Sequence, residues 1–331
     1  MSLAAAIKRE ARSLGFEAVG ISRIQDSCEP SSIGDRPDSS DLPLPRLLLT
    51  RLHTWLQRGY HGTMAWMARD PSRRADPRLV LPGCRSIISL GMNYDTGHRP
   101  TEGPGYGRIA RYAWGKDYHQ VIGTRLQALE AKIVELVPGA ATRAYVDTGP
   151  IMEKAWAQQA GVGWIGKHSN LVSSDYGSWL LLGELLTTLD LPPDEPATDL
   201  CGSCTLCIQA CPTGAIVEPY LVDATRCISY LTIEYRGPRE DIRSDLSSRM
   251  GAHIFGCDDC LDVCPFNLRA EPTKEPAFLP STFTGSARLD ELAVLDEAAF
   301  MERFHESPVR RAKLQGLQRN VAIAKANQPH P

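Results

Sequence analysis

The chain has 331 residues, of which 36 are basic and 39 acidic, and 43% are hydrophobic. This composition excludes a disordered or collagen-like chain, and a net charge of −3 gives no global argument for nucleic-acid binding. The length favours two or three domains. The longest apolar run, residues 179–189, is interrupted by Glu184 and is too short to span a membrane. The N-terminus also lacks the apolar stretch of a secretory signal, so we expect a soluble, cytoplasmic protein.

Helices and strands are predicted to alternate over the first part of the chain. Residues 3–14 have the spacing of an amphipathic helix that ends at Gly15, and a short strand follows at residues 18–22. Residues 26–45 are rich in Ser, Pro and Asp and predict a mobile surface insertion. Helices are then expected near residues 48–56, 118–137 and 150–159. Strands are expected between and after them, near residues 85–92, 143–146 and 178–186. This alternation indicates an α/β domain over residues 1–190, without a Walker loop or a G-x-G-x-x-G run.

The second part of the chain has a different character. Residues 190–199 contain three prolines and four acids and predict a linker. A cysteine-rich segment follows, and residues 287–299, 300–305 and 308–325 are predicted to be helical. We therefore expect an α/β domain at residues 1–190, a cysteine-rich domain at residues 191–270 and a short helical C-terminal cap at residues 271–331.

The cysteines carry the most specific signal. Eight of the ten lie between residues 201 and 264. Cys201-x2-Cys204-x2-Cys207-x3-Cys211-Pro212 is the run that binds [4Fe–4S] clusters in bacterial ferredoxins. Cys257-x2-Cys260-x3-Cys264-Pro265 lacks the first cysteine of such a run, and Cys227 can supply it. Disulfides are disfavoured because they belong to small secreted chains, and zinc sites rarely use a four-cysteine run. Cys28 is interpreted as a loop thiol and Cys84 as a small buried apolar residue.

Eight thiolates make two complete sets of four ligands, which predicts a ferredoxin-like domain with two [4Fe–4S] clusters. In two-cluster ferredoxins the fourth cysteine of each run binds the other cluster. We therefore expect one cluster to be held by Cys201, Cys204, Cys207 and Cys264. The second would be held by Cys211, Cys227, Cys257 and Cys260. Two clusters in series conduct electrons, but no flavin or nicotinamide fingerprint identifies their acceptor. The spacing leaves open a redox enzyme or an electron-transfer subunit.

Three segments outside the cysteine groups, at residues 60–69, 111–119 and 145–170, resemble the epoxyqueuosine reductase family. The last contains the runs Tyr145-Val-Asp-Thr-Gly-Pro and Gly163-Trp-Ile-Gly-Lys-His. The resemblance extends over the cysteine groups and to about residue 325. It implies a cobalamin-dependent oxidoreductase with two [4Fe–4S] clusters, whose α/β domain binds cobalamin. Such an enzyme reduces epoxyqueuosine to queuosine at the wobble position of tRNA, the last step of queuosine biosynthesis.

The resemblance also implies roles for individual residues. Asp147 matches the family's proton donor to the departing epoxide oxygen, and it would lie beside the cofactor. Six further residues are expected to contact cobalamin: Arg69, Lys167, Asn170, Ser229, Tyr230 and His253. His119 is expected to face the modified base.

Local charge is compatible with a tRNA partner. Residues 69–125 contain ten Lys or Arg against five Asp or Glu, and residues 303–325 contain six against one. We also expect a low-potential electron donor of the flavodoxin or ferredoxin type, no membrane partner and a monomer. Two other functions stay open: a reductive-dehalogenase-like corrinoid reductase of a small molecule, and a ferredoxin-type electron-transfer subunit without catalysis of its own.

Overall fold

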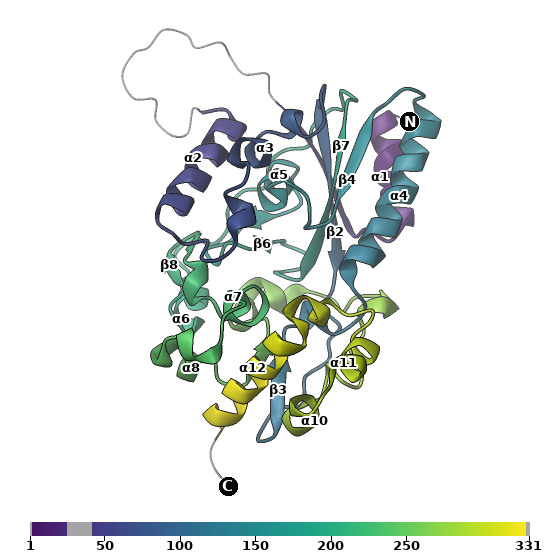
Figure 1. Cartoon of the computed structure of the whole chain (residues 1–331). Helices are drawn as coiled ribbons and strands as arrows, with labels where there is room; N and C mark the ends of the chain where they lie inside the picture. Colours follow the sequence, from purple (N-terminus) through teal and green to yellow (C-terminus); the bar gives the residue numbers. More distant parts are fainter. Residues whose placement is uncertain (1, 25–41, 329–331) are drawn as a thin grey trace. The chain divides into compact units, whose positions relative to one another are not determined.

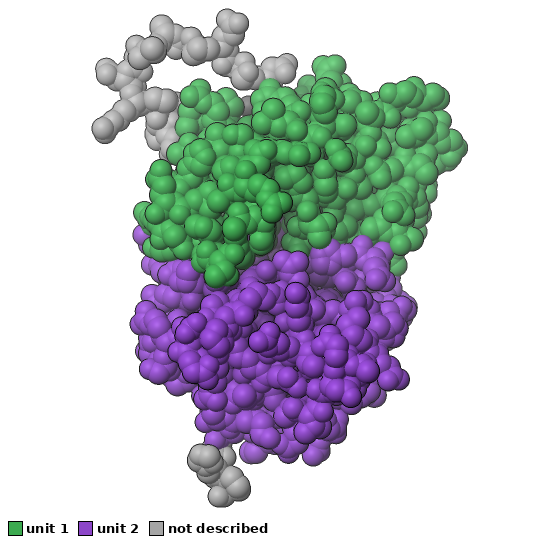
Figure 2. Space-filling model, in the orientation of Figure 1, with its two compact units in different colours: residues 1–92, 122–164, 182–200 green, residues 93–121, 165–181, 201–331 purple. Residues whose placement is uncertain are grey.

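The computed structural model describes residues 2–24 and 42–328 (Figure 1). Its packing divides the chain into two compact units (Figure 2). Unit 1 comprises residues 1–92, 122–164 and 182–200, and unit 2 comprises residues 93–121, 165–181 and 201–331. The expected mixture of helices and strands is confirmed, whereas the three-domain organisation stays a prediction. Cys28 and most of the predicted insertion lie outside the described residues.

Unit 1 is built on a four-stranded sheet in the order β1 (Ala18–Arg23), β2 (Ser86–Asn93), β7 (Leu180–Thr187) and β4 (Thr142–Tyr145). β1 runs antiparallel to β2, and β4 antiparallel to β7. At one end of the β2–β7 pair the Arg85 amide donates to the Thr187 carbonyl at 2.9 Å. At the other end the Tyr94 amide donates to the Trp179 carbonyl at 2.9 Å. The two central strands are therefore antiparallel as well.

Helices cover both faces of this sheet, and β2 is therefore buried along its whole length. α1 (Leu3–Ser13) and α4 (Tyr118–Leu136) lie on one face, and α2 (Leu44–Gln57), α3 (Pro71–Ala75) and α5 (Glu153–Gln159) on the other (Figure 1). α4 packs so closely on β7 that a Cβ at Gly183 would meet the Ile122 side chain at 2.9 Å. The core on the α5 side is one apolar cluster: Ile24, Val80, Cys84, Ile87, Ile151, Trp156 and Leu186.

Unit 2 combines short strands and short helices. A three-stranded sheet has the order β10 (His253–Phe255), β3 (Tyr106–Ile109) and β11 (Ala287–Arg288). The other strands are β5 (Trp164–Ile165), β6 (Leu171–Val172), β8 (Ile216–Glu218) and β9 (Leu221–Val222). The helices are α6 (Leu206–Ala210), α7 (Ile228–Ile233), α8 (Ser244–Arg249), α9 (Asp259–Asp262), α10 (Leu289–Ala293), α11 (Glu297–Arg303) and α12 (Lys313–Asn327). The buried face of α12, with Leu317 and Val321, packs in one apolar cluster with Ile254 and Phe255 of β10.

Most predicted elements are confirmed, and three boundaries are wrong. α5 begins at Glu153 rather than at Pro150, because residues 150–152 belong to the preceding turn. The predicted helix at residues 287–299 starts instead as β11, which pairs with β3, and helix follows as α10 and α11. The predicted helix at residues 308–325 is divided at Lys313, where φ is +60°. No helix within the described ranges has the length and hydrophobicity needed to cross a bilayer.

Candidate functional site

A tight turn between β4 and α5 carries Asp147 in unit 1. The Thr148 amide donates to the Val146 carbonyl at 2.5 Å, and Asp147 has φ +56°, in the left-handed region. Aspartate tolerates this conformation better than most side chains. Gly149 packs against the ring of Tyr145, where a Cβ would lie 2.3 Å from Cδ1. The turn therefore needs glycine at that position, and it leaves Asp147 exposed at its tip.

The first residue of α5 holds this turn in place. Glu153 Oε1 accepts a hydrogen bond of 2.6 Å from the backbone amide of Asp147. A carboxylate in the first turn of a helix is also favoured by the helix dipole. Asp147 is predicted from the sequence, whereas Glu153 is not, since nothing in the chain order indicates that the helix reaches back to the turn.

A second acidic side chain lies in the sheet beside the same turn. Glu184 of β7 pairs with Tyr145 of β4, and its side chain is fully buried. Ser89 Oγ donates to Glu184 Oε2 at 2.8 Å. Burial raises the pKa of Glu184 well above its ordinary range and the charge of Glu153 raises it further, while the Ser89 hydrogen bond opposes this shift. The sequence did contain a signal for this residue, because a lone acid interrupts the apolar run at residues 179–189.

The eight predicted cluster cysteines all lie in unit 2, and none of them forms a disulfide. The first run forms a loop that leads into α6 and ends at Cys211. Cys227 directly precedes α7, and the remaining three cysteines lie at or beside α9. α6 packs against α9, so the two cysteine-bearing segments meet although about fifty residues separate them.

Seven of the eight thiols fall into two groups according to which neighbouring thiols raise one another's pKa. Burial is the main cause that raises the pKa of four thiols, and neighbouring thiols raise it further. The first thiol group, defined by these interactions, is Cys201, Cys204 and Cys207. The second thiol group is Cys211, Cys227, Cys257 and Cys260. Cys260 is also affected by Cys207, so the two groups are neighbours.

The donor set fits an iron–sulfur cluster better than a single zinc ion. Four thiolates around zinc at about 2.3 Å would have sulfur atoms about 3.8 Å apart. Within the described ranges no three cysteines have all their sulfur atoms within 4.8 Å of one another. An iron–sulfur core is larger than a single ion and can reach thiols that lie farther apart. His253, Cys257 and Asp259 do lie within 4.8 Å of one another, but Asp259 already binds His253 and Arg108.

Lys167 fastens the loop of the first cysteine run. Its Nζ donates to the carbonyl oxygens of Gly202 at 2.5 Å and Cys204 at 2.9 Å. Asn170 follows in the same segment, where its backbone amide donates to His168 Nδ1 at 3.1 Å. Two residues that were expected near the corrin therefore lie in a segment that contacts the first thiol group's loop. Their contact with cobalamin stays a prediction.

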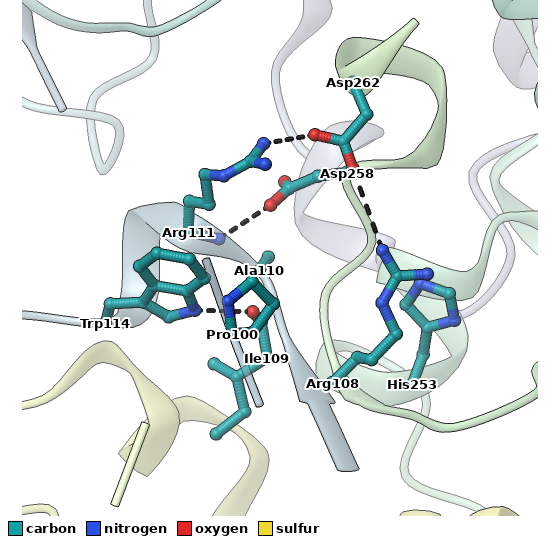
Figure 3. Close-up of a pocket in the computed structure, with 9 residues that line it drawn as sticks. All are labelled: Pro100, Arg108, Ile109, Ala110, Arg111, Trp114, His253, Asp258 and Asp262. Atoms are coloured by element: carbon teal, nitrogen blue, oxygen red, sulfur yellow. Dashed lines mark hydrogen bonds and ion pairs between the residues drawn. The ribbon is translucent and has the colours of Figure 1, made fainter. Parts of the chain in front are cut away.

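His253 lies in a polar pocket, four residues before Cys257 of the second thiol group. Its Nδ1 is 2.9 Å from the Met250 carbonyl and its Nε2 is 3.2 Å from Asp259 Oδ1, so both ring nitrogens have partners. Figure 3 shows the pocket, in which the Arg111 side chain pairs with Asp262 and its backbone amide donates to Asp258 at 2.7 Å. Burial raises the pKa of Asp258 to about 6, against the stabilising hydrogen bond from Arg111. Four of its nine lining residues are charged, and both arginines, Arg108 and Arg111, pair with Asp262.

The other predicted contacts are spread over both units. Ser229 and Tyr230 lie in α7 just after Cys227, and Tyr230 is buried. His119 of unit 2 stacks on Tyr118 with ring centroids 4.1 Å apart, and its Nδ1 lies 2.6 Å from Asp117 Oδ1. Arg69 is exposed in unit 1. Their roles stay predictions.

Two family profiles match the chain. Residues 74–148 match "Epoxyqueuosine reductase QueG, DUF1730", and residues 200–267 match "4Fe-4S double cluster binding domain". The second match spans the two cysteine groups, as the spacing predicted.

Similar proteins extend this match over nearly the whole chain. An epoxyqueuosine reductase of Gloeobacter violaceus is 45% identical over 326 residues, covering 97% of this chain and 95% of its own. One of Synechocystis sp. is 46% identical over 272 residues, covering 82% and 93%.

Solved structures agree with these relatives. Epoxyqueuosine reductase from Streptococcus thermophilus is 28% identical with a TM-score of 0.85, covering 99% of this chain and 82% of its own. Another epoxyqueuosine reductase, determined with an epoxyqueuosine-modified tRNA-Tyr stem loop, is 29% identical with a TM-score of 0.85, covering 98% and 81%. The chain belongs to the epoxyqueuosine reductase family, which is a family of oxidoreductases.

Proposed function

We propose that this chain reduces epoxyqueuosine to queuosine in tRNA, with electrons that pass through two [4Fe–4S] clusters to cobalamin and with Asp147 as proton donor. The observation that carries the proposal is the gathering of eight cysteines in one unit of a chain that belongs to this family over nearly its full length. The structure determined with a modified stem loop supports the substrate, because that protein is a relative.

Each cluster would have four cysteine ligands that come from both cysteine groups. Cys264 would complete the first thiol group, since it follows α9, and α9 packs against the helix that contains Cys207. The second thiol group would hold the other cluster. Because α6, which contains Cys207, packs against α9, which contains Cys260, single electrons could pass between neighbouring clusters without leaving unit 2.

Cobalamin is implied by the family and would supply a reduced cobalt ion, which is a strong nucleophile toward an epoxide. Hydrogen-bond donors suited to its amide and phosphate oxygens are present at Arg69, Lys167 and Asn170. Lys167 contacts the loop of the first thiol group, and Ser229 and Tyr230 follow Cys227, so donors and cluster ligands neighbour each other within unit 2. We propose these residues, with His253, as the contacts of the cofactor in this chain.

The protein's own residues would hold the general acid and orient the modified nucleobase of the tRNA. Asp147 lies at the tip of a turn that Glu153 fixes through the backbone amide, so the carboxyl can approach the epoxide oxygen without a rearrangement of the sheet. A positioned general acid typically accelerates such a step by about 10²–10⁴-fold. His119 would contact the modified base, with its ring oriented by the stack on Tyr118 and by Asp117.

The test is conversion of authentic substrate. Protein that is purified and reconstituted without oxygen, then supplied with cobalamin and a low-potential reductant, is incubated with tRNA that carries epoxyqueuosine. Mass spectrometry of the nucleosides is expected to show queuosine formed in step with loss of epoxyqueuosine. Unchanged epoxyqueuosine would overturn the proposed reaction. Equal turnover after complete removal of the corrinoid would overturn only the role of cobalamin and would leave the proposed reaction in place.

A further inference from the structure

Asp259 places a negative charge inside the cysteine segment of residues 257–264. A carboxylate oxygen of Asp259 and the Sγ of Cys257 lie within 4.8 Å of each other. The Asp259 side chain is only 16% exposed, so water screens its charge weakly. Nothing in the chemistry described so far uses this carboxylate.

Two residues that are partners in a sheet hold this carboxylate in place. His253 of β10 pairs with Arg108 of β3 in the parallel ladder. Asp259 Oδ1 lies 3.2 Å from His253 Nε2 and accepts a hydrogen bond of 3.1 Å from Arg108 Nη1. The contact with Arg108 is an ion pair, which favours the ionised form of Asp259. Both partners lie outside residues 257–264, so the sheet, and not the group that Cys257 binds, fixes the carboxylate.

Arg108 offsets only part of the Asp259 charge. Its Nη2 lies 3.7 Å from Asp262 Oδ2 (Figure 3), and its Nε lies 3.5 Å from Glu102 Oε1. One guanidinium therefore serves three carboxylates. Because its charge is shared in this way, Arg108 does not cancel the field of Asp259 at the Cys257 sulfur.

A charge at this place acts on the reduction potential of a bound cluster. A [4Fe–4S] cluster gains one electron on reduction, so its reduced form is more negative than its oxidised form. A nearby carboxylate destabilises the reduced form and lowers the potential, whereas a nearby cation raises it. The proposed reaction needs electrons of low potential, because the cobalt of cobalamin is hard to reduce to its nucleophilic state.

We propose that Asp259 lowers the reduction potential of the cluster held by the second thiol group, and that Arg108 limits this effect. This role rests on the proposed function, which supplies both the cluster and the cofactor that receives its electrons. The cluster takes one electron from a low-potential donor of the flavodoxin or ferredoxin type and passes that electron on toward cobalamin. No bond or proton of Asp259 changes, and Asp259 does not touch the substrate.

Asp259→Asn tests this role, because it removes the charge and keeps the shape of the side chain. Arg108→Gln removes the opposing charge. The control is Asp290→Asn, since Asp290 is an exposed aspartate of the same unit whose partner, Lys325, lies 2.6 Å away. The three variants and the wild-type protein are reconstituted without oxygen and titrated with redox mediators, and EPR follows the reduction of each cluster.

The two charge changes should move the same midpoint potential in opposite directions. In D259N the equilibrium constant for reduction of that cluster should rise about tenfold, which is about 59 mV toward higher potential for one electron. In R108Q the same midpoint should move to lower potential. The other midpoint should move less in both variants, and D290N should match the wild type. A merely structural defect would not produce opposite shifts at wild-type iron content.

Each outcome decides for or against this role. An unchanged or lower midpoint in D259N overturns it, and so do shifts of the same sign in D259N and R108Q. If D259N does not bind its second cluster, R108Q decides alone, and an unchanged or higher midpoint there overturns the role. Failure of the proposed function is seen in a different measurement, because wild-type protein would then leave epoxyqueuosine unchanged whatever the potentials of its clusters.

Discussion

Replacement of Asn320 by Leu should release the second proposed cluster. Asn320 of α12 is fully buried, and its Nδ2 donates to the Thr232 carbonyl at 2.8 Å and the Ile254 carbonyl at 2.9 Å. Thr232 lies in α7, which directly follows Cys227, and Ile254 lies in β10, which ends two residues before Cys257. One side chain therefore joins the two segments that carry these cysteines.

The size of the effect follows from the two carbonyls. Leu has a similar volume but no donor, so both carbonyl oxygens would stay buried without their present partner. Each such group costs about 1–3 kcal/mol, which gives about 2–6 kcal/mol in the free energy of unfolding. Typical domains have only about 5–15 kcal/mol of stability in total. We expect N320L to unfold at a markedly lower temperature and to hold about half the wild-type iron after anaerobic reconstitution.

Asn327 provides the matched control. It lies in the same helix and also donates to two carbonyls, those of Ser247 at 2.8 Å and Gly251 at 3.2 Å, which lie outside the cysteine segments. N327L should keep its iron and the EPR signals of its reduced clusters. Iron content equal to wild type in N320L, or equal losses in both variants, would refute the reasoning.

Three further predictions concern single residues. Asp147→Asn should keep wild-type iron content and lose about 10²–10⁴-fold in kcat, because the positioned acid is removed; near-wild-type turnover of epoxyqueuosine-tRNA would argue against the acid role. Cys264→Ala should remove the EPR signal of the cluster held by the first thiol group, and loss of the other cluster would contradict the exchange of ligands between the two cysteine runs. Burial raises the pKa of the Cys84 thiol to about 11, so it should resist iodoacetamide at pH 8 until the protein unfolds. Peptide mass spectrometry measures this, and rapid alkylation of the folded protein would show that the thiol is accessible.

Local sequence pattern was sufficient for elements whose stability is local. α1 follows from the spacing of Ile7 and Ala11, the Ser2 cap and the glycine at position 15, where φ is +92°. β11 could not be predicted in this way. It is two residues long and exists because it pairs with β3, about 180 residues earlier in the chain. Propensity alone made that segment a helix, and tertiary pairing decided otherwise.

The candidate site was predictable where one residue type has one dominant use. Eight cysteines at ferredoxin spacing identify an iron–sulfur segment without any coordinates, because few other sites need that pattern. The supporting residues were not predictable on the same grounds. Asn320 and Arg319 are ordinary helix residues in the sequence, yet Arg319 donates to the carbonyls of Leu231, Tyr235 and Gly237 behind α7.

The turn at Asp147 illustrates why motif and geometry contribute different information. The family run contains Tyr145, Asp147 and Gly149, and resemblance alone marks the aspartate. The structure adds the reason for its neighbours: Gly149 has to lack a side chain because its Cα packs on the Tyr145 ring, and Tyr145 pairs with Glu184 in the sheet. The exposed acid and the buried acid are thus joined by one rigid aromatic residue. A change in the sheet at Glu184 can therefore reach the turn through the packing of Tyr145.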